Sequence, residues 1–208
     1  LPLDTTFLQP PMPTRGHIGF VSHSGAFCAA VIDWARGQSF GFSQIASLGS
    51  NMLMVRVGQR LGPGQRSVAK AFALRDVEAI VNQIGSVAGA APAASQPTIA
   101  IYGNENWSTT VTGTNNAYFS VRDWRFASGR PFTDGELRGG QAVCIIGATV
   151  QKELFGGQDP LGSKIRLRQF ACQVQGVLEA KGQSTMGTDQ DDLILMPLRT
   201  FQRRIAGN

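Results

Sequence analysis

A turn near the N-terminus has the residue types that bind anions. Ser22, Ser24 and Gly25 directly follow an apolar run at Ile18–Val21, which has the composition of a buried strand. A helix is predicted to begin just after the turn and to end at Gly37. The free backbone N–H groups and the positive dipole end of such a helix point at the turn. The spacing predicts a candidate anion site at Ser22, Ser24 and Gly25.

The histidines and glycine-rich segments lack the context that catalysis or nucleotide binding requires. A general base must be oriented by a partner, and we expect His17 at a strand edge and His23 in a turn. The segments Gly58–Gly64 and Gly139-Gly140 fit neither the P-loop pattern nor GxGxxG. We therefore expect no catalytic residue, no enzyme activity and no bound cofactor.

An acidic cluster resembles a calcium loop in composition alone. Asp189, Asp191 and Asp192 supply oxygen ligands, but the segment lacks the glycine and the closing glutamate of an EF-hand. We expect no metal site here. We interpret the cluster as a solvated turn or as a partner for the nearby Lys181 and Arg199.

The three cysteines do not form a zinc motif. Cys28, Cys144 and Cys172 are widely spaced, and an odd number cannot all pair within one chain. Cys144 and Cys172 fall in apolar strand runs, where a free cysteine usually behaves as a small buried hydrophobe. We expect two buried thiols, and a Cys144–Cys172 disulfide is the alternative in an oxidising compartment.

The chain is basic, with 19 Lys and Arg against 14 Asp and Glu and a formal net charge of +5. No RNP-like aromatic strand or helix-turn-helix pattern accompanies this charge, so we do not expect nucleic-acid binding. A solvated basic face is the simplest interpretation, and an acidic membrane surface or acidic partner is the alternative. The densest basic groups are Lys164, Arg166 and Arg168, and Arg199, Arg203 and Arg204.

The 208 residues suffice for one large domain or for a domain with an appendage. The 25 glycines suit many short strands and turns better than a helical bundle. No apolar run approaches the ~18 residues that span a bilayer. The chain opens on Leu without a signal peptide, and we expect a processed or excised piece of a longer protein.

The clearest run of elements lies between Gln141 and Pro197. An apolar strand at Ala142–Ile146 precedes a helix that Thr149 is expected to cap and that Gly156 is expected to end. The helix carries Val150, Leu154 and Phe155 as its apolar stripe. Further strands are predicted at 164–168, 171–178 and 193–196, with Ile165 and Leu167 alternating against basic residues.

The preceding stretch also reads as short strands and helices. The predicted fold class is α+β, with mixed small sheets, few helices, two subdomains and an N-terminal β-α-β appendage. Trp124 and Phe126 are expected to be core or subdomain-contact aromatics. The predicted elements are strands at 42–48, 52–57, 87–94, 98–102 and 107–112, a helix at 74–84 and a helical turn at 115–119.

Three stretches resemble the periplasmic core domain of MacB-type ABC-transporter permeases. They read GRPFTDGELRGGQAVCIIG, LFGGQDPLGSKIRL and QVQGVLEAKGQSTMGTDQDDLILMPL, and the resemblance covers residues 45–208. It implies a non-catalytic domain at the periplasmic face of the bacterial inner membrane, within an efflux transporter. Its implied role is to contact a periplasmic adaptor protein and to relay ATP-driven motion. The parent permease is expected to dimerise and to reach the membrane through helices that this chain lacks.

The beginning of the chain resembles a different family. The stretch GHIGFVSHSGAFCAAVIDWARGQSFGFSQIASLG, within residues 1–49, is similar to the ligase-CoA domain of ADP-forming acyl-CoA synthetases, the succinyl-CoA ligase relatives. In that family a helix beginning at the equivalent of Ser24-Gly25 faces a phosphorylated histidine. No histidine follows His23 in this chain.

These two resemblances divide the chain into a fusion appendage at 1–44 and a MacB-like domain at 45–208. They also leave rival functions open. One rival is an acyl-CoA synthetase fragment with residual CoA or phosphate binding at Ser22–Gly25. The other is a stand-alone ligand-binding module that uses the region of Trp107 and Trp124. The transported substrate and the oligomeric state are not readable from the sequence.

Overall fold

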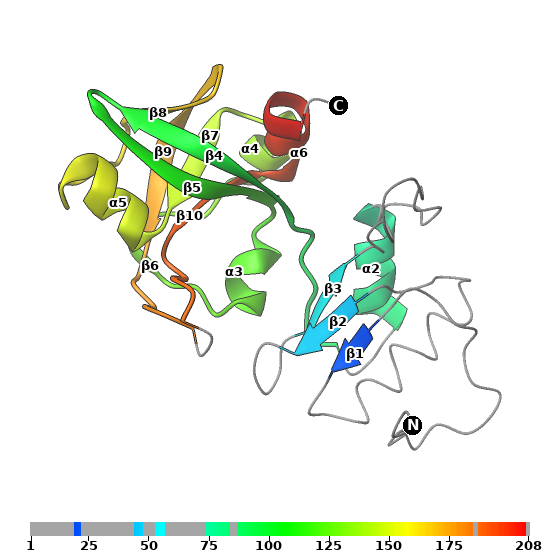
Figure 1. Cartoon of the computed structure of the whole chain (residues 1–208). Coiled ribbons are helices and arrows are strands. Elements are labelled where there is room, and N and C mark those ends of the chain that lie inside the picture. Colours follow the sequence, from blue (N-terminus) through cyan, green and yellow to red (C-terminus); the bar gives the residue numbers. More distant parts are fainter. Residues whose placement is uncertain are drawn as a thin grey trace, which may run out of the picture. The chain divides into compact units, whose positions relative to one another are not determined.

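Two compact units, Leu1–Ala90 and Ala91–Asn208, make up the chain. In the part of the chain that is described, no helix is both long and apolar enough to cross a membrane. The computed structural model, shown in Figure 1, describes residues 19–21, 44–47, 53–56, 74–83, 87–184 and 187–206.

The first unit contains a three-stranded sheet in the order β1-β2-β3. β1 (Gly19–Val21) and β2 (Gln44–Ser47) pair in parallel, as a β-α-β unit predicts. The helix expected between them lies outside the described residues. β2 also pairs with β3 (Leu53–Arg56), so the sheet joins residues on both sides of the predicted boundary at 44/45. That domain boundary stays a prediction.

The second unit is built on one mixed seven-stranded sheet in the order β6-β9-β7-β10-β5-β4-β8. β9 pairs with β7 on one side and with β8 on the other, so six of the strands close into a barrel. The few helices and the mixed sheet confirm the predicted fold class. The strands are β4 (Ala94–Tyr102), β5 (Glu105–Thr114), β6 (Phe126–Gly129), β7 (Val143–Ile146), β8 (Lys164–Leu167), β9 (Phe170–Leu178) and β10 (Leu193–Pro197).

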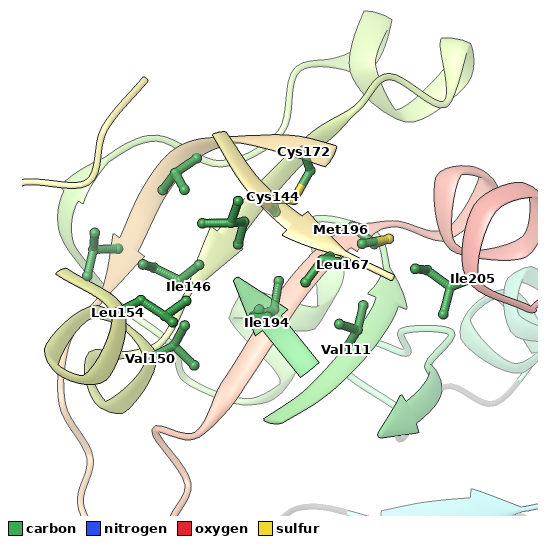
Figure 2. Packing of buried hydrophobic residues seen from close by; sticks show 14 of the residues in the cluster. Val111, Cys144, Ile146, Val150, Leu154, Leu167, Cys172, Ile194, Met196 and Ile205 are labelled. Atoms are coloured by element: carbon green, nitrogen blue, oxygen red, sulfur yellow. A yellow bond between two sulfur atoms is a disulfide. The ribbon is translucent and has the colours of Figure 1, made fainter. Parts of the chain in front are cut away.

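Two strands of the barrel differ in how many of their faces are buried. Successive side chains of a strand point to opposite faces, and Cys144 and Ile146 of β7 lie in the barrel interior, shown in Figure 2. Ile145 lies in a second cluster with Phe119 and Trp124. β7 therefore reads as a continuous apolar run, whereas the β8 pattern alternates because its outer face meets solvent. The alternation predicted for β8 is confirmed.

Helix α5 (Ala148–Phe155) closes one end of the barrel, and its predicted stripe is confirmed. Val150, Leu154 and Phe155 are buried in the interior cluster. The prediction that Thr149 caps α5 is wrong, because the N-cap is Gly147. A Cβ at position 147 would collide with the Asp191 carbonyl oxygen, which explains why a glycine stands at this N-cap. Thr149 instead donates to Asp189 at 2.7 Å.

The C-terminal helices close the other end. α6 (Leu198–Phe201) and the π-helical turn η1 (Gln202–Ala206) bury Phe201 and Ile205 in the same interior cluster. Gly113 of β5 lies directly under the Phe201 ring, where any Cβ would collide with it. Glycine at this position therefore lets α6 approach the barrel. Pro197 is the last residue of β10 and the N-cap residue of α6.

Two elements between β5 and β7 form the second cluster with β6. α3 (Ala117–Val121) matches the helical turn expected here, whereas α4 (Asp134–Gly139) was not predicted. Thr133 and Glu136 form a capping box at the start of α4, and Gly140 ends it in the left-handed region. The strand expected at 87–94 is wrong: the strand begins at Ala94 and continues through Tyr102.

Cys144 and Cys172 form a disulfide, and the expectation of two free thiols is wrong. β7 and β9 are parallel neighbours, and this register brings the two Cα atoms to 5.8 Å. Both side chains point into the barrel and are buried. Their spacing along the chain did not reveal the pairing, because the adjacency of β7 and β9 is a property of the closed sheet.

Candidate functional site

The anion site proposed from the sequence cannot be placed in three dimensions. Ser22, Ser24 and Gly25 lie outside the described residues, and so do His17 and His23. The anion site therefore stays a prediction. The polar residues that the structure does bring together lie in the second unit, in the segment between β9 and β10.

The segment between β9 and β10, residues 179–192, is held by a buried carboxylate. Asp191 is 5% exposed, and its two oxygens accept from the backbone N–H groups of Lys181 and Gly182, both at 2.8 Å. The Asp191 N–H donates to Asp189 at 2.8 Å. A buried carboxylate with several donors fixes the backbone around it, because leaving it unpaired would be costly. We call this segment the 179–192 loop.

The acidic cluster is therefore a set of structural acceptors. Besides its bond to the Asp191 N–H, Asp189 accepts from Thr149, and Asp192 accepts from the Trp107 indole at 3.0 Å. Lys181 is a partner of the cluster as predicted, but through its backbone, whereas Arg199 donates to the Arg138 carbonyl instead. Within the described ranges, no group of three or more His, Cys, Asp or Glu is placed to hold a metal ion.

Lys181 and Trp124 connect the 179–192 loop to the turn between α3 and β6. The Lys181 ammonium lies 4.5 Å from the Trp124 ring centroid and donates to the Arg122 carbonyl. Such a cation–π contact is favourable when the cation is partly desolvated, and desolvation lowers the pKa of Lys181. A shallow groove beside this contact is lined by Asp123, Arg125, Glu179, Ala180 and Lys181.

Trp107 and Trp124 do not form a common ligand platform. Trp107 packs against the barrel-interior cluster and donates to Asp192. Trp124 is 6% exposed and belongs to the second cluster, together with Phe119 and Phe132. The prediction that Trp124 and Phe126 are core aromatics is confirmed, because Phe126 packs against that same cluster.

An ion pair between the exposed Arg130 and the buried Glu136 fixes the segment that leads into α4. Arg130 contacts both carboxylate oxygens of Glu136, at 2.8 and 2.9 Å, and also donates to Gln175 of β9 at 3.2 Å. Glu136 also accepts from the Thr133 N–H at 2.7 Å. The Arg130 hydrogen bonds are the main reason that the pKa of Glu136 falls to about 2. The TxxE spacing is the sequence signal that could have revealed this arrangement.

The two basic groups noted in the sequence lie on exposed positions of the second unit. Lys164 and Arg166 are on the outer face of β8, and Arg168 occupies the β8–β9 turn. On the helices at the far end, Phe201 and Ile205 are buried while the basic side chains are exposed. Those basic side chains are Arg199, Arg203 and Arg204.

Several carboxylates of the described region already serve as hydrogen-bond acceptors within the domain. The carboxylates of Asp189, Asp191 and Glu136 are occupied by hydrogen bonds that hold the backbone. The charges around the groove are of both signs, and they lie on the 179–192 loop and on the turn between α3 and β6. Mixed charges at the rim of a groove can give specificity to a protein interface.

Comparison with known proteins shows which protein family this sequence is similar to. The family model described as the MacB-like periplasmic core domain matches residues 26–208. The macrolide export ATP-binding/permease protein MacB of Syntrophobacter fumaroxidans is 34% identical over 184 residues, which is 86% of this chain and 26% of that protein. MacB of Rhodospirillum rubrum is 39% identical over 169 residues, or 79% and 25% of the two chains. The chain spans about a quarter of the length of these relatives.

Solved structures share the fold. The extracellular domain of the noncanonic ABC-type transporter YknZ from Gram-positive bacteria has a TM-score of 0.56 at 24% identity, covering 66% of this chain and 68% of that one. The periplasmic region of MacB from Actinobacillus actinomycetemcomitans has a TM-score of 0.55 at 20% identity, covering 72% and 66%. At these identities the likeness concerns the fold alone.

The ligase resemblance at the N-terminus finds no support in these comparisons. The family match begins at residue 26, inside the stretch interpreted as a ligase-like appendage. The shared features were short: a strand, a glycine turn and a helix start. Many unrelated α/β segments have this pattern, because it is the usual way to begin a helix after a buried strand.

Proposed function

The chain belongs to the MacB-like periplasmic core domain family, and from this membership we propose that it contacts a periplasmic adaptor protein and relays ATP-driven motion during export. The family match over residues 26–208 is the observation that carries this proposal. The relatives are ATP-binding/permease proteins by name. In the proposed parent protein, other segments bind ATP and cross the inner membrane, and two permease copies dimerise around a non-catalytic periplasmic domain.

The disulfide supports a periplasmic location. Cys144 and Cys172 are bonded in the barrel interior, and such bonds persist in oxidising compartments such as the bacterial periplasm. A cytosolic environment would keep both thiols reduced. The covalent link therefore supports the proposed location by a route that is independent of the family match.

The closed barrel has the mechanical properties that a relay needs. Its interior is filled by side chains of strands and of three helical elements, including Val111, Ile146 and Met196. Close-packed interiors have low compressibility and transmit strain. The disulfide joins two neighbouring strands of the same barrel. A displacement applied at one end would therefore reach the other end as motion of a rigid body.

We place the adaptor contact at the 179–192 loop and its groove. Asp191 and the Lys181–Trp124 contact hold the described residues beside the groove in place, so little conformational entropy is lost there when a partner binds. Arg125 and Glu179 present opposite charges at the groove, which can select a partner with the complementary arrangement.

The test is to titrate the chain with the adaptor protein encoded beside the parent permease, using calorimetry. We expect saturable binding that the Arg125→Ala/Glu179→Ala variant weakens by about tenfold, a change of ~1.4 kcal/mol. Lys152→Ala is the matched control, because Lys152 is exposed on α5, away from the groove. Absence of binding by the unaltered chain would remove the adaptor proposal. Equal binding by both variants would remove only the placement at this loop.

The relay is tested separately in the full-length permease. We expect the Cys144→Ala/Cys172→Ala permease to keep its ATP hydrolysis rate while substrate export decreases, because the barrel that transmits motion is loosened. Parallel losses of hydrolysis and export would instead indicate misfolding of the permease. An unchanged export rate would show that the barrel need not be cross-linked to serve as a relay.

A further inference from the structure

Six exposed arginines gather at the end of the barrel that α6 and η1 close. Contacts between their elements bring them together. Arg199 donates to the Arg138 carbonyl at 2.9 Å, and the amide of Gln96 lies between the Arg168 guanidinium and the Ile205 carbonyl, at 3.0 and 3.2 Å. We call this the arginine surface; its members are Arg138, Arg166, Arg168, Arg199, Arg203 and Arg204.

The positive charge of the arginine surface is not neutralised by neighbouring acids. The strands β4, β8, β9 and β10 and the helices α6 and η1 contain no Asp or Glu. On α4 the exposed Asp134 occupies the first turn and Arg138 the last. The ion pairs of the described residues involve Arg75 and Arg130, neither of which belongs to this surface. A single-sign field of this kind attracts anionic surfaces.

An exposed isoleucine adjoins the arginines. Ile99 of β4 is 54% exposed. Register pairs Ile101 with Arg166 and Ala100 with Leu167, so Ile99 and Ile101 share the outer sheet face with Arg166, beside the Arg168 turn. A bulky apolar side chain beside arginines suits a binding surface that is both anionic and apolar.

The β8–β9 turn holds an arginine where glycine would fit more easily. Arg168 has a φ of 56°, in the left-handed region, at a two-residue hairpin turn for which Gly, Asn or Asp is favoured. Left-handed backbone at such a residue is a strained conformation that points to a role for the side chain. The Arg168 guanidinium adds one more cation to the arginine surface.

We propose that the arginine surface binds the phosphate-bearing headgroups of anionic phospholipids. The charges are spread over four elements at this barrel end, and among the described residues we find there no exposed aromatic anchor of the kind that concentrates binding energy in protein interfaces. Tyr102, an exposed aromatic, instead stacks on Phe155 of α5. A diffuse anionic lipid surface needs no matching arrangement of charges, and each basic residue adds to the attraction. In Figure 1, α6 and the connection from β9 to β10 lie at opposite ends of the second unit.

The experiment is co-sedimentation of the 208-residue chain with vesicles of equal parts phosphatidylglycerol and phosphatidylcholine, and with phosphatidylcholine vesicles. We expect binding to the anionic vesicles alone, weakened by raised salt. Arg203→Glu/Arg204→Glu should weaken it by about tenfold or more, and Ile99→Ser by a smaller factor. The control variant Arg75→Glu/Lys152→Glu changes the net charge by the same amount, but on α2 and α5. It should bind the anionic vesicles nearly as well as the unaltered chain does. The Arg166→Gln/Arg204→Gln variant removes two positive charges without introducing acidic residues, and it should also weaken binding to the anionic vesicles.

Three results would overturn the proposal. One is no binding of the unaltered chain to anionic vesicles. Another is an equal loss in the Arg75→Glu/Lys152→Glu control, which would show a response to net charge alone. The third is vesicle binding that the surface variants leave intact while they abolish adaptor binding, which would assign the surface to an acidic protein. The proposal does not depend on the adaptor contact, so either can fail alone.

Discussion

Helices α5 and α2 show that the same sequence pattern can lead to opposite degrees of burial. Both carry apolar residues at helical spacing, and both form where the sequence predicts them. In α5, Val150 and Leu154 are 0% and 2% exposed. In α2 (Leu74–Gln83) no residue is buried, and Leu74 and Val81 are 46% and 38% exposed.

The difference comes from what each helix meets. α5 closes the end of a barrel whose strands leave an apolar opening, and it contacts β4, β5, β9 and β10. α2 belongs to the unit Leu1–Ala90, whose described strands form a sheet of three. A helical stripe specifies which face can be buried, and a surface elsewhere in the chain decides whether it is. Stability should therefore concentrate in the barrel.

The largest effect is expected for Leu154→Ala. The substitution removes buried methyl groups from α5 and leaves a cavity, so the free energy of unfolding should fall by about 2–5 kcal/mol. Lys152→Ala on the exposed face of the same helix should change it by less than about 0.5 kcal/mol. Urea melts followed by circular dichroism measure both. Equally mild melts would mean that α5 does not close the barrel.

A similar loss should follow from opening the disulfide. The Cys144–Cys172 bond closes a loop with a sequence separation of 28, and its removal should lower the free energy of unfolding by about 2–4 kcal/mol. The difference in the free energy of unfolding is measured between the Cys144→Ala/Cys172→Ala variant and the oxidised unaltered chain. The reduced unaltered chain is the control. If the melting curve is the same with and without the bond, the barrel owes its stability to packing alone.

Low pH should lower the folding stability of the second unit, because Glu136 becomes protonated. Hydrogen bonds from Arg130 hold the pKa of Glu136 at about 2 in the folded state, against an ordinary value of 4.5 for a glutamate. A lowered folded-state pKa gives stabilisation that is complete above the unfolded value and is lost as pH falls toward about 2. Because the Arg130 side chain is 44% exposed, we expect a loss of roughly 1–2 kcal/mol.

The measurement is urea unfolding of the unaltered chain and of Glu136→Gln as the pH is lowered from above 4.5 toward about 2. The variant lacks the titrating carboxyl, so the difference between the two free energies should narrow as the pH falls. A difference that stays constant with pH would place the stabilising effect in the shape of the side chain and not in its charge.

A small effect is expected in α2. Ile80→Ala truncates a half-buried side chain on the helix without buried residues, and it should cost under about 1 kcal/mol. Thermal unfolding of Ile80→Ala beside Leu154→Ala gives the contrast within one experiment. Losses of equal size would mean that α2 is packed as closely as α5, and the contrast between the two helices would disappear.

The smallest effect is expected from removing residues 1–43. The family resemblance that we found in the sequence is complete without the first 44 residues, so a chain starting at Gln44 should unfold cooperatively with an unchanged midpoint for the barrel. Calorimetry of the two chains checks this. Loss of the cooperative transition would show that the segment belongs to the core. The family match from residue 26 makes this comparison especially informative.

Several local features of the barrel could be predicted from short stretches of sequence. The alternation of Ile165 and Leu167 against basic residues predicted the two faces of β8, and the spacing of Val150 and Leu154 predicted the buried stripe of α5. The capping box at Thr133–Glu136 was equally predictable and was missed, although its TxxE spacing directly marks the start of α4. These features depend on neighbours within a few residues, which the sequence displays.

The functional surfaces depended on longer distances. The chain alone indicated the basic residues of β8 and of the C-terminal helices, but not that Gln96 links their ends. It presented the Asp189–Asp192 segment as a possible ion loop, whereas the structure uses Asp191 to hold Lys181 and Gly182. A carboxylate's role depends on which donors surround it, and here those donors lie about ten residues away.

By itself, the sequence determined many of the elements, the buried faces of α5 and β8 and the family resemblance of residues 45–208, because each depends on residue type and short-range period. The tertiary structure decided that β9 joins β7 and β8, and so that the sheet closes. The pairing of β7 with β9 placed Cys144 beside Cys172, and the packing of helices on the closed sheet buried α5 and brought Arg199 to Arg138. Strand pairing between distant segments is chosen by the packing of the whole interior, which local patterns do not encode.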